Sequence, residues 1–234
     1  MPGGSLAAHG HYRVGWPFWV SHNEFRVSRR CLTFPVPGPT QMDDAVLRAM
    51  ARWPNVPDVY GWLSLDKRGE WRLKGGTIGN EGLRAFISRN YLRTPDGCYV
   101  FQNGPQRVFV ALAYTPWVLD IDGSGALRTH TAAAAVLSGR GWMDESGALL
   151  LETDAGIALV DDRDLEQLTA AMLNVNGQVM SDDEQIQAVE LLLGPEHHKL
   201  SLRWGGQRID LDFVDSNDVA AKFNFEPEPV PGDE

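Results

Sequence analysis

The chain has 234 residues, of which 43% are hydrophobic and 22% are charged, so it can bury a sizeable core and does not have the composition of a disordered protein. Its formal net charge of -10 at pH 7 argues against nucleic acid as a partner, because an acidic surface repels phosphate backbones. The sequence shows neither an apolar run long enough to cross a bilayer nor the apolar core of a secretory signal, so we expect a cytoplasmic protein with no membrane partner.

Residues 1–41 have no sustained hydrophobic period and contain the proline-rich run FPVPGPTQ. We expect them to be either a disordered arm or a mis-called upstream extension of a native chain that starts at Met42, and both readings stay open. From Met42 to Trp53 the apolar residues repeat at helical spacing, and Pro54 is expected to end that helix.

A strand, turn, strand, helix pattern then occurs twice. In the first copy, Leu63–Leu65 and Trp71–Leu73 form a hairpin if Gly69 takes the left-handed position of its loop, which places Leu65 opposite Trp71. The run that ends at Tyr91 supplies the first helix. The second copy runs from Gly141-Trp142 to about Leu173 and has the same order of elements.

Apolar residues on both faces predict that Cys98–Gln102 and Arg107–Ala111 are central strands of a sheet. Another hairpin is expected at 119–128. Further along, Ser181 and Glu184 form a capping box for a helix that should bury Ile186, Val189 and Leu193. The last hairpin should pair Leu200 with Leu211 and Leu202 with Ile209.

These patterns predict an α+β fold of antiparallel β hairpins in two related ββα-type units, with short packing helices and flexible termini. The expected boundaries are an N-terminal extension at 1–41, a first β-rich unit with an N-terminal helix at 42–140, a second β-rich unit at 141–216 and a disordered acidic tail at 217–234.

The sequence offers one polar group of residues for ligand binding. Arginine presents a bidentate fork and amides both donate and accept, so such side chains can hold an anion or a peptide carboxylate. The alternative reading is that they satisfy backbone groups where loops cross the central strands. The candidate binding residues are Arg89, Asn90, Gln102, Asn103, Gln106 and Arg107.

Other chemistries have little support in the sequence. No histidine among His9, His11, His22, His197 and His198 has further ligands at metal-binding spacing, so we expect no metal site and no cofactor. Phosphate-binding glycine motifs and GxSxG are absent as well. Two cysteines, Cys31 and Cys98, are expected to be buried or inert thiols.

Two further hypotheses compete with a binding module. One is a small hydrolase that uses His130 as a base beside Thr129 or Asp144, which requires a cleft and a carboxylate partner for His130. The other is a structural subunit marked by an exposed apolar patch. The oligomeric state cannot be read from the sequence.

The runs YGWLSLDKRGEWRLKG, FISRNY and GCYVFQNGPQRVFVAL closely resemble an uncharacterised proteobacterial family of unknown function, over about Arg52 to Met172. That family supplies no catalytic residues to carry over. The order of a G-x-W hairpin, a helix start and a D-G-x-Y strand is distantly similar to a second bacterial family of unknown function, described as repeated small β-rich motifs with a suggested signalling role. The second resemblance favours a binding or regulatory module. Together with the composition and the polar residues above, we expect a cytoplasmic, non-catalytic module with a regulatory or signalling role, whose partner is a small anionic ligand or a protein segment.

Overall fold

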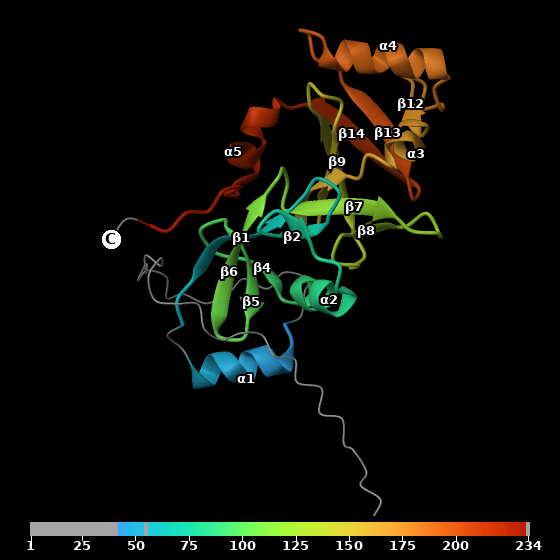
Figure 1. The fold of residues 1–234 in the computed structure, drawn as a ribbon. Helices are drawn as coiled ribbons and strands as arrows, with labels where there is room; N and C mark the ends of the chain where they lie inside the picture. The colour runs from blue at the N-terminus through green and yellow to red at the C-terminus, as the bar shows by residue number, and fades with distance from the viewer. Residues whose placement is uncertain (1–41, 54–55, 233–234) are drawn as a thin grey trace, which may run out of the picture.

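The structure is a computed structural model that describes residues 42–53 and 56–232 (Figure 1). Within these residues the chain forms two large β-sheets and a few short helices, which confirms a mixed α+β protein. The helices are α1 (Asp44–Arg52), α2 (Glu81–Arg89), α3 (Leu165–Thr169), α4 (Asp182–Leu193), a 3-10 turn (Ser216–Asp218) and α5 (Val219–Phe223). The expectations for residues 1–41 lie outside the described residues.

The strands divide into two sheets, which we call sheet A and sheet B. In spatial order, sheet A contains β3 (Gly76–Thr77), β2 (Trp71–Leu73), β1 (Val59–Leu65), β6 (Gln106–Leu112), β5 (Tyr99–Asn103) and β4 (Tyr91–Arg93). Sheet B contains β12 (Met172–Leu173), β13 (Leu200–Trp204), β14 (Gln207–Phe213), β9 (Leu137–Met143), β10 (Leu149–Thr153), β11 (Gly156–Val160), β7 (Trp117–Ile121) and β8 (Leu127–Thr129).

The two sheets share an arrangement that the hairpin pattern did not predict in full. The order β3-β2-β1-β6-β5-β4 of sheet A corresponds to β11-β10-β9-β14-β13-β12 of sheet B, and each has one parallel contact at its centre, β1 with β6 and β9 with β14. The remaining pair, β7–β8, joins sheet B through a further parallel contact with β11. The predicted boundary at residue 140 therefore does not coincide with the division between the sheets.

Four hairpin turns are built by the same local hydrogen bonds. In each, an Asp or Asn oxygen accepts the backbone N–H groups two and four residues later, and a glycine three residues later takes a positive φ that other residues adopt at a cost. These pairs are Asp66 with Gly69, Asp122 with Gly125, Asp144 with Gly147 and Asn174 with Gly177. The turns fix the register, and the predicted pairing of Leu65 with Trp71 is confirmed.

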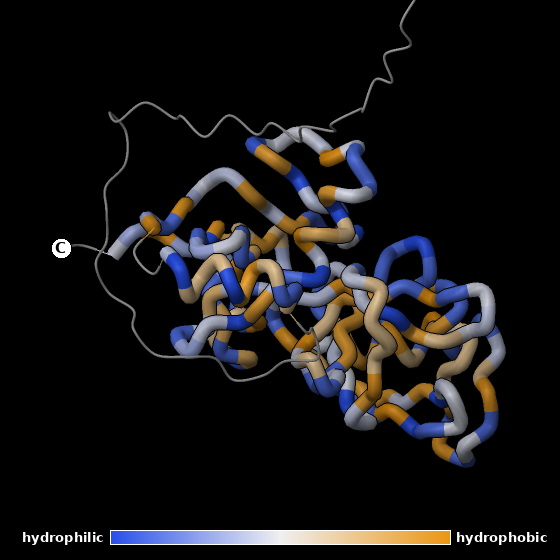
Figure 2. Tube along the Cα trace, turned by 90° about the horizontal axis from the view of Figure 1, so that it is seen from below, coloured by the Kyte–Doolittle hydropathy of each residue, from blue (hydrophilic) through white to orange (hydrophobic). Residues whose placement is uncertain are grey.

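One hydrophobic core runs through both sheets. Trp71 and Tyr91 from sheet A belong to the same buried cluster as Trp117, Trp142 and Leu150 from sheet B. A smaller cluster lies on the other face of sheet A, around Val100 and Phe109, as the two-sided apolar pattern predicted. In Figure 2 hydrophobic stretches recur within the packed part of the trace, and hydrophilic stretches recur at its outer bends.

The end of the chain is ordered, so the prediction of a disordered tail is wrong for residues 217–232. Val219 and Phe225 are buried, and Glu226 N–H donates to the Gly97 carbonyl at 3.1 Å while Leu112 N–H donates to the Pro227 carbonyl at 2.8 Å. The chain thus returns from α5, beside sheet B, to sheet A (Figure 1). Its acidic, proline-rich composition predicted disorder, but a few apolar residues suffice to anchor the segment.

Helix α4 is partly as predicted. The capping box of Ser181 and Glu184 is present, and the helix ends at Leu193. Val189 and Leu193 pack against the core as predicted, but Ile186 is 60% exposed and Leu192 is fully buried. Three consecutive leucines leave the helical phase ambiguous, so packing against β13 and β14 chose the face.

Candidate functional site

Helix α2 presents the first two candidate residues at its C-terminal end. The helix begins where the Asn80 side chain accepts the Leu83 N–H at 2.9 Å, and it buries Ile87 against the core. Arg89 occupies the last turn and Asn90 is the C-cap. At this end of the helix Arg89 is exposed, whereas the adjacent Asn90 is fully buried.

Asn90 binds both the backbone and the side chain of Asp43. Its Oδ1 accepts the Asp43 N–H at 3.0 Å, and its Nδ2 donates to the Phe86 carbonyl at 2.9 Å and to Asp43 Oδ2 at 3.4 Å. A buried amide needs such partners, because an unpaired polar group inside a protein is destabilising. Asn90 thereby fixes the residue that precedes α1.

Arg89 completes the contact with the same carboxylate. Its Nε donates to Asp43 Oδ1 at 3.2 Å and its Nη2 to Oδ2 at 3.4 Å. The hydrogen bond from Arg89 lowers the pKa of Asp43 below its usual range, against an opposing effect of burial. The Asp43 carboxylate is thus held by a bidentate fork, the geometry that the sequence analysis assigned to Arg89.

Gln106 and Arg107, at the start of β6, hold a second point on the same stretch of chain. Gln106 Nε2 donates to the Pro57 carbonyl at 3.3 Å. The Arg107 guanidinium donates to both carboxylate oxygens of Asp58, with 2.8 Å from Nε to Oδ1, and lies over the Phe109 ring. This ion pair is largely shielded from solvent, because the Asp58 side chain is only 12% exposed.

Gln102 and Asn103 have different positions. Gln102 is buried, and its Nε2 donates to the Gly104 carbonyl at 2.8 Å, so it shapes the β5–β6 turn rather than facing outward. Asn103 lies exposed at the end of β5, opposite Gln106 in the ladder. An ideal Cβ on Gly104 would lie 3.6 Å from the Ala49 Cβ, so α1 passes over this turn.

Four of the six predicted residues therefore bind one segment of the chain. We call residues 43–58 the bound segment, and the side chains of Arg89, Asn90, Gln106 and Arg107 the recognition surface. The carboxylates of Asp43 and Asp58 were missed: an aspartate at a helix start is already accounted for by the helix dipole, and nothing in the local pattern marks Asp58. A ligand other than this segment at these residues remains a prediction.

His130 does not have the surroundings of a catalytic base. Its ring packs among the rings of Trp71, Tyr91 and Trp117, at centroid distances of 5.1, 5.5 and 5.6 Å. Its Nδ1 accepts the Val118 N–H at 3.3 Å, whereas the buried Nε2 has no hydrogen-bond partner among the described residues. Burial lowers the pKa of His130 to about 3.

The hydrolase hypothesis also fails for the partners proposed for His130. Thr129 Oγ1 pairs with Thr131 Oγ1 at 2.8 Å. Asp144 holds its own hairpin turn and accepts the Tyr114 hydroxyl at 2.6 Å. A base that is buried among aromatic rings, with no carboxylate beside it in the part of the chain that the structure describes, is poorly placed to take a proton from a substrate, so the structure contradicts the hypothesis.

The described residues contain no group of three or more His, Cys, Asp or Glu side chains placed to hold a metal ion. His197 stacks on Phe213, and His198 pairs with Glu196. Cys98 is a free, buried thiol whose pKa is raised to about 11, mainly by burial, which makes it a poor nucleophile. Cys31, His9, His11 and His22 lie outside the described residues.

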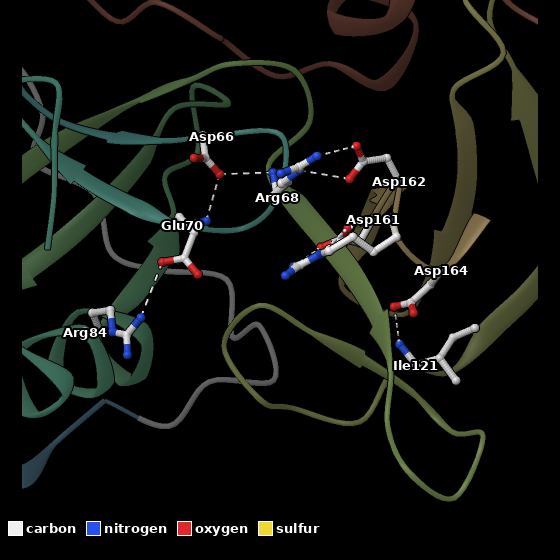
Figure 3. A network of polar contacts seen from close by, with 9 residues as sticks. Asp66, Arg68, Glu70, Arg84, Ile121, Asp161, Asp162 and Asp164 are labelled. Carbon is white, nitrogen blue, oxygen red and sulfur yellow. Dashed lines mark hydrogen bonds and ion pairs between the residues drawn. The ribbon is translucent and has the colours of Figure 1, made fainter. Parts of the chain in front are cut away.

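A second polar network joins the two sheets (Figure 3). Arg68, in the β1–β2 turn, donates to both oxygens of Asp162 at 2.9 and 2.8 Å, and Asp164 Oδ2 accepts the Ile121 N–H at 2.9 Å. Both side chains of the Arg68–Asp162 pair are more than half exposed, so the pair adds little stability. These residues fix the packing between the β1–β2 turn and the loop before α3.

Comparisons with known proteins agree with the resemblance found in the sequence. The family model DUF2944, described as "Protein of unknown function (DUF2946)", matches residues 42–230. The chain belongs to this family. A search of curated proteins found no match.

Among solved structures, the chain is similar to a DUF1285 family protein from Silicibacter pomeroyi DSS-3, with 18% sequence identity and a TM-score of 0.45, over 68% of this chain and 85% of the other. None of the helices in the described residues is long and apolar enough to span a membrane.

Proposed function

We propose that this chain is a non-catalytic, cytoplasmic binding module with a regulatory or signalling role, and that its recognition surface takes a carboxylate-bearing protein segment. One observation carries the proposal: Arg89 and Arg107, both selected from the sequence as anion-binding residues, each hold a carboxylate of the bound segment. The resident segment thus serves as a ligand within the chain.

A protein segment fits the recognition surface better than a small anion does. Asn90 accepts a backbone N–H, and Gln106 donates to a backbone carbonyl, in addition to the two carboxylate contacts. A small anion supplies only the carboxylate or phosphate oxygens, so it would leave the buried Asn90 incompletely bonded. Paired backbone and side-chain contacts are typical of peptide recognition.

Direct binding of the segment in trans tests the proposal. A fluorescent peptide of residues 42–58 would be titrated against the full chain with Asp43→Ala and Val46→Asp, which weaken the resident segment and leave the recognition surface intact. We expect binding that is lost when Arg89→Ala is added, because the carboxylate loses its bidentate partner.

Arg84→Ala on the same helix is the matched control, since Arg84 pairs with Glu70 on another side of α2. Equal binding by the Arg89 and Arg84 variants, or no binding at all, would contradict the proposal.

We also infer that the two units descend from one duplicated unit. The common strand order of the sheets supports this, and so does the sequence: Gln207 and Arg208 occupy in β14 the register positions that Gln106 and Arg107 occupy in β6. The contacts differ, because Arg208 pairs with Asp210 of its own strand. The second unit thus repeats the Gln-Arg pair of the recognition surface but has Ala170 and Ala171 where the first unit has Arg89 and Asn90.

A further inference from the structure

We infer that the recognition surface reads the first turn of a helix, and that α1 occupies it as a displaceable ligand. The partner is a helix with Asp at its N-cap, a valine-sized apolar residue three positions later and alanine six positions later. This inference rests on the proposed function and adds the partner's sequence and the regulation of the site.

The N-cap residue of α1 is used in an unusual way. Asp is favoured at N-caps because its side chain accepts the free N–H groups of the first turn. Asp43 is the N-cap of α1, yet its side chain makes no capping hydrogen bond and binds Arg89 and Asn90 instead. When α1 leaves the surface, the carboxylate regains its capping role, which partly compensates the lost contacts.

Asn90 makes the contact specific for this position. Its amide meets the N–H and the carboxylate of one and the same residue, Asp43. In a helix interior the backbone N–H bonds within the helix, so a residue that offers both groups lies at the N-terminus. Asn90 therefore favours an acidic residue at the start of a helix over one in its interior.

Two further positions of α1 face the protein. Val46 is 3% exposed and is the buried residue of this helix. Ala49 lies against Gly104: a Cβ built on Gly104 would be 3.6 Å from the Ala49 Cβ. A side chain larger than alanine at position 49 would therefore push the helix away from the β5–β6 turn. Leu47 and Trp53 are about half exposed. An Asp, a Val three positions later and an Ala six positions later follow from these contacts.

Helix α1 is held mainly because it is tethered. With one buried residue and an uncapped first turn, a helix of this length is marginal by itself. A short tether, however, gives it an effective concentration on the order of millimolar at the surface. A partner helix with the same three residues and additional contacts elsewhere can therefore displace it, and a weakened α1 should raise the apparent affinity of the surface.

The test uses the full chain with Asp43→Ala and Val46→Asp, and a labelled peptide of residues 42–53. We expect the peptide to bind this variant at least about tenfold more tightly than the wild-type chain. Replacing Asp43 by Asn or Ala49 by Phe in the peptide should weaken binding about tenfold or more, and replacing the exposed Leu47 by Ala should change it less than about twofold. A single Asp43→Ala chain serves if the double variant does not melt cooperatively.

The outcomes separate the two proposals. Equal binding by all peptides would leave the proposed function in place and overturn the reading of the first turn. No binding of any peptide, including the 42–58 peptide, would overturn both. Hydrogen exchange of the wild-type chain gives an independent check: amides of α1 that exchange as slowly as those of β5 and β6 would overturn displacement.

Discussion

Identical residue types have different roles in this protein because their neighbours differ. Asp66 accepts backbone N–H groups within its own turn, whereas Asp43, placed at a helix start, is held by residues nearly fifty positions away. The residue type does not distinguish these two roles, because the neighbouring residues set each of them. The two predictions at this scale concern residues whose surroundings are unusual.

His130 should make the fold sensitive to acid. Its pKa is about 3 in the folded protein and about 6.5 in an unfolded chain, so the unfolded state binds the proton more readily. The stabilisation is complete above the unfolded value and is lost as pH falls from about 6.5 toward 3. Relative to His130→Phe, the wild-type free energy of unfolding should fall by about 2 kcal/mol between pH 7 and 4.5, measured by urea unfolding.

His198→Gln, which replaces an exposed histidine, is measured alongside as the control. Parallel pH profiles for wild type and His130→Phe would show that His130 is accessible to protons in the folded state.

Gly69 is constrained by conformation and by contact. Its φ of +77° disfavours other residues, and an added Cβ would lie 2.6 Å from the Cβ of His130. We expect Gly69→Ala to destabilise the protein by about 2–3 kcal/mol in denaturant unfolding. Gly147 has a φ of +81° with nothing within 4 Å of an added Cβ, so Gly147→Ala should cost about 1 kcal/mol. Equal costs would mean that the turn shifts away from His130.

At the scale of elements, hairpins were predictable and helix faces less so. The Asp-x-x-Gly turns fix where their hairpins reverse, and alternation then sets which residues pair, as with Leu65 and Trp71. In α4 the apolar residues fit more than one helical phase, and the prediction that Ile186 is buried was wrong. The C-terminal segment was missed because its anchors are isolated apolar residues.

The C-terminal segment should contribute to stability. Phe225 is 7% exposed and belongs to the shared core, so Phe225→Ala should lower the free energy of unfolding by about 3 kcal/mol, measured with urea. Val230 is 75% exposed, and Val230→Ala should have an effect below about 0.5 kcal/mol. If the two variants were equally stable, the segment would not be docked in solution.

Over the molecule as a whole, the two sheets pack against one shared core. Their inward faces share a single hydrophobic cluster, and the C-terminal segment and the Arg68–Asp162 pair cross between them. Neither sheet can expose its inner face to water without losing much of this buried area. The predicted units at 42–140 and 141–216 therefore share one core, whereas independent domains would each have their own.

Calorimetry should show one unfolding transition for the full chain. Leu65→Ala in sheet A and Leu151→Ala in sheet B, both almost fully buried, should each lower the same Tm by about 5–10 °C. Two transitions, each shifted by only one of the variants, would contradict a shared core.

Local sequence patterns specified the hairpin turns, the capped helices, the cross-strand registers and the residues able to bind a carboxylate. Each of these depends on neighbours within a few positions, where spacing and side-chain chemistry act directly. Tertiary packing set the parallel contacts between hairpins, the buried face of α4, the position of the C-terminal segment and the carboxylates at Arg89 and Arg107. These depend on which distant surfaces bury the most apolar area together, and a local pattern does not contain that information.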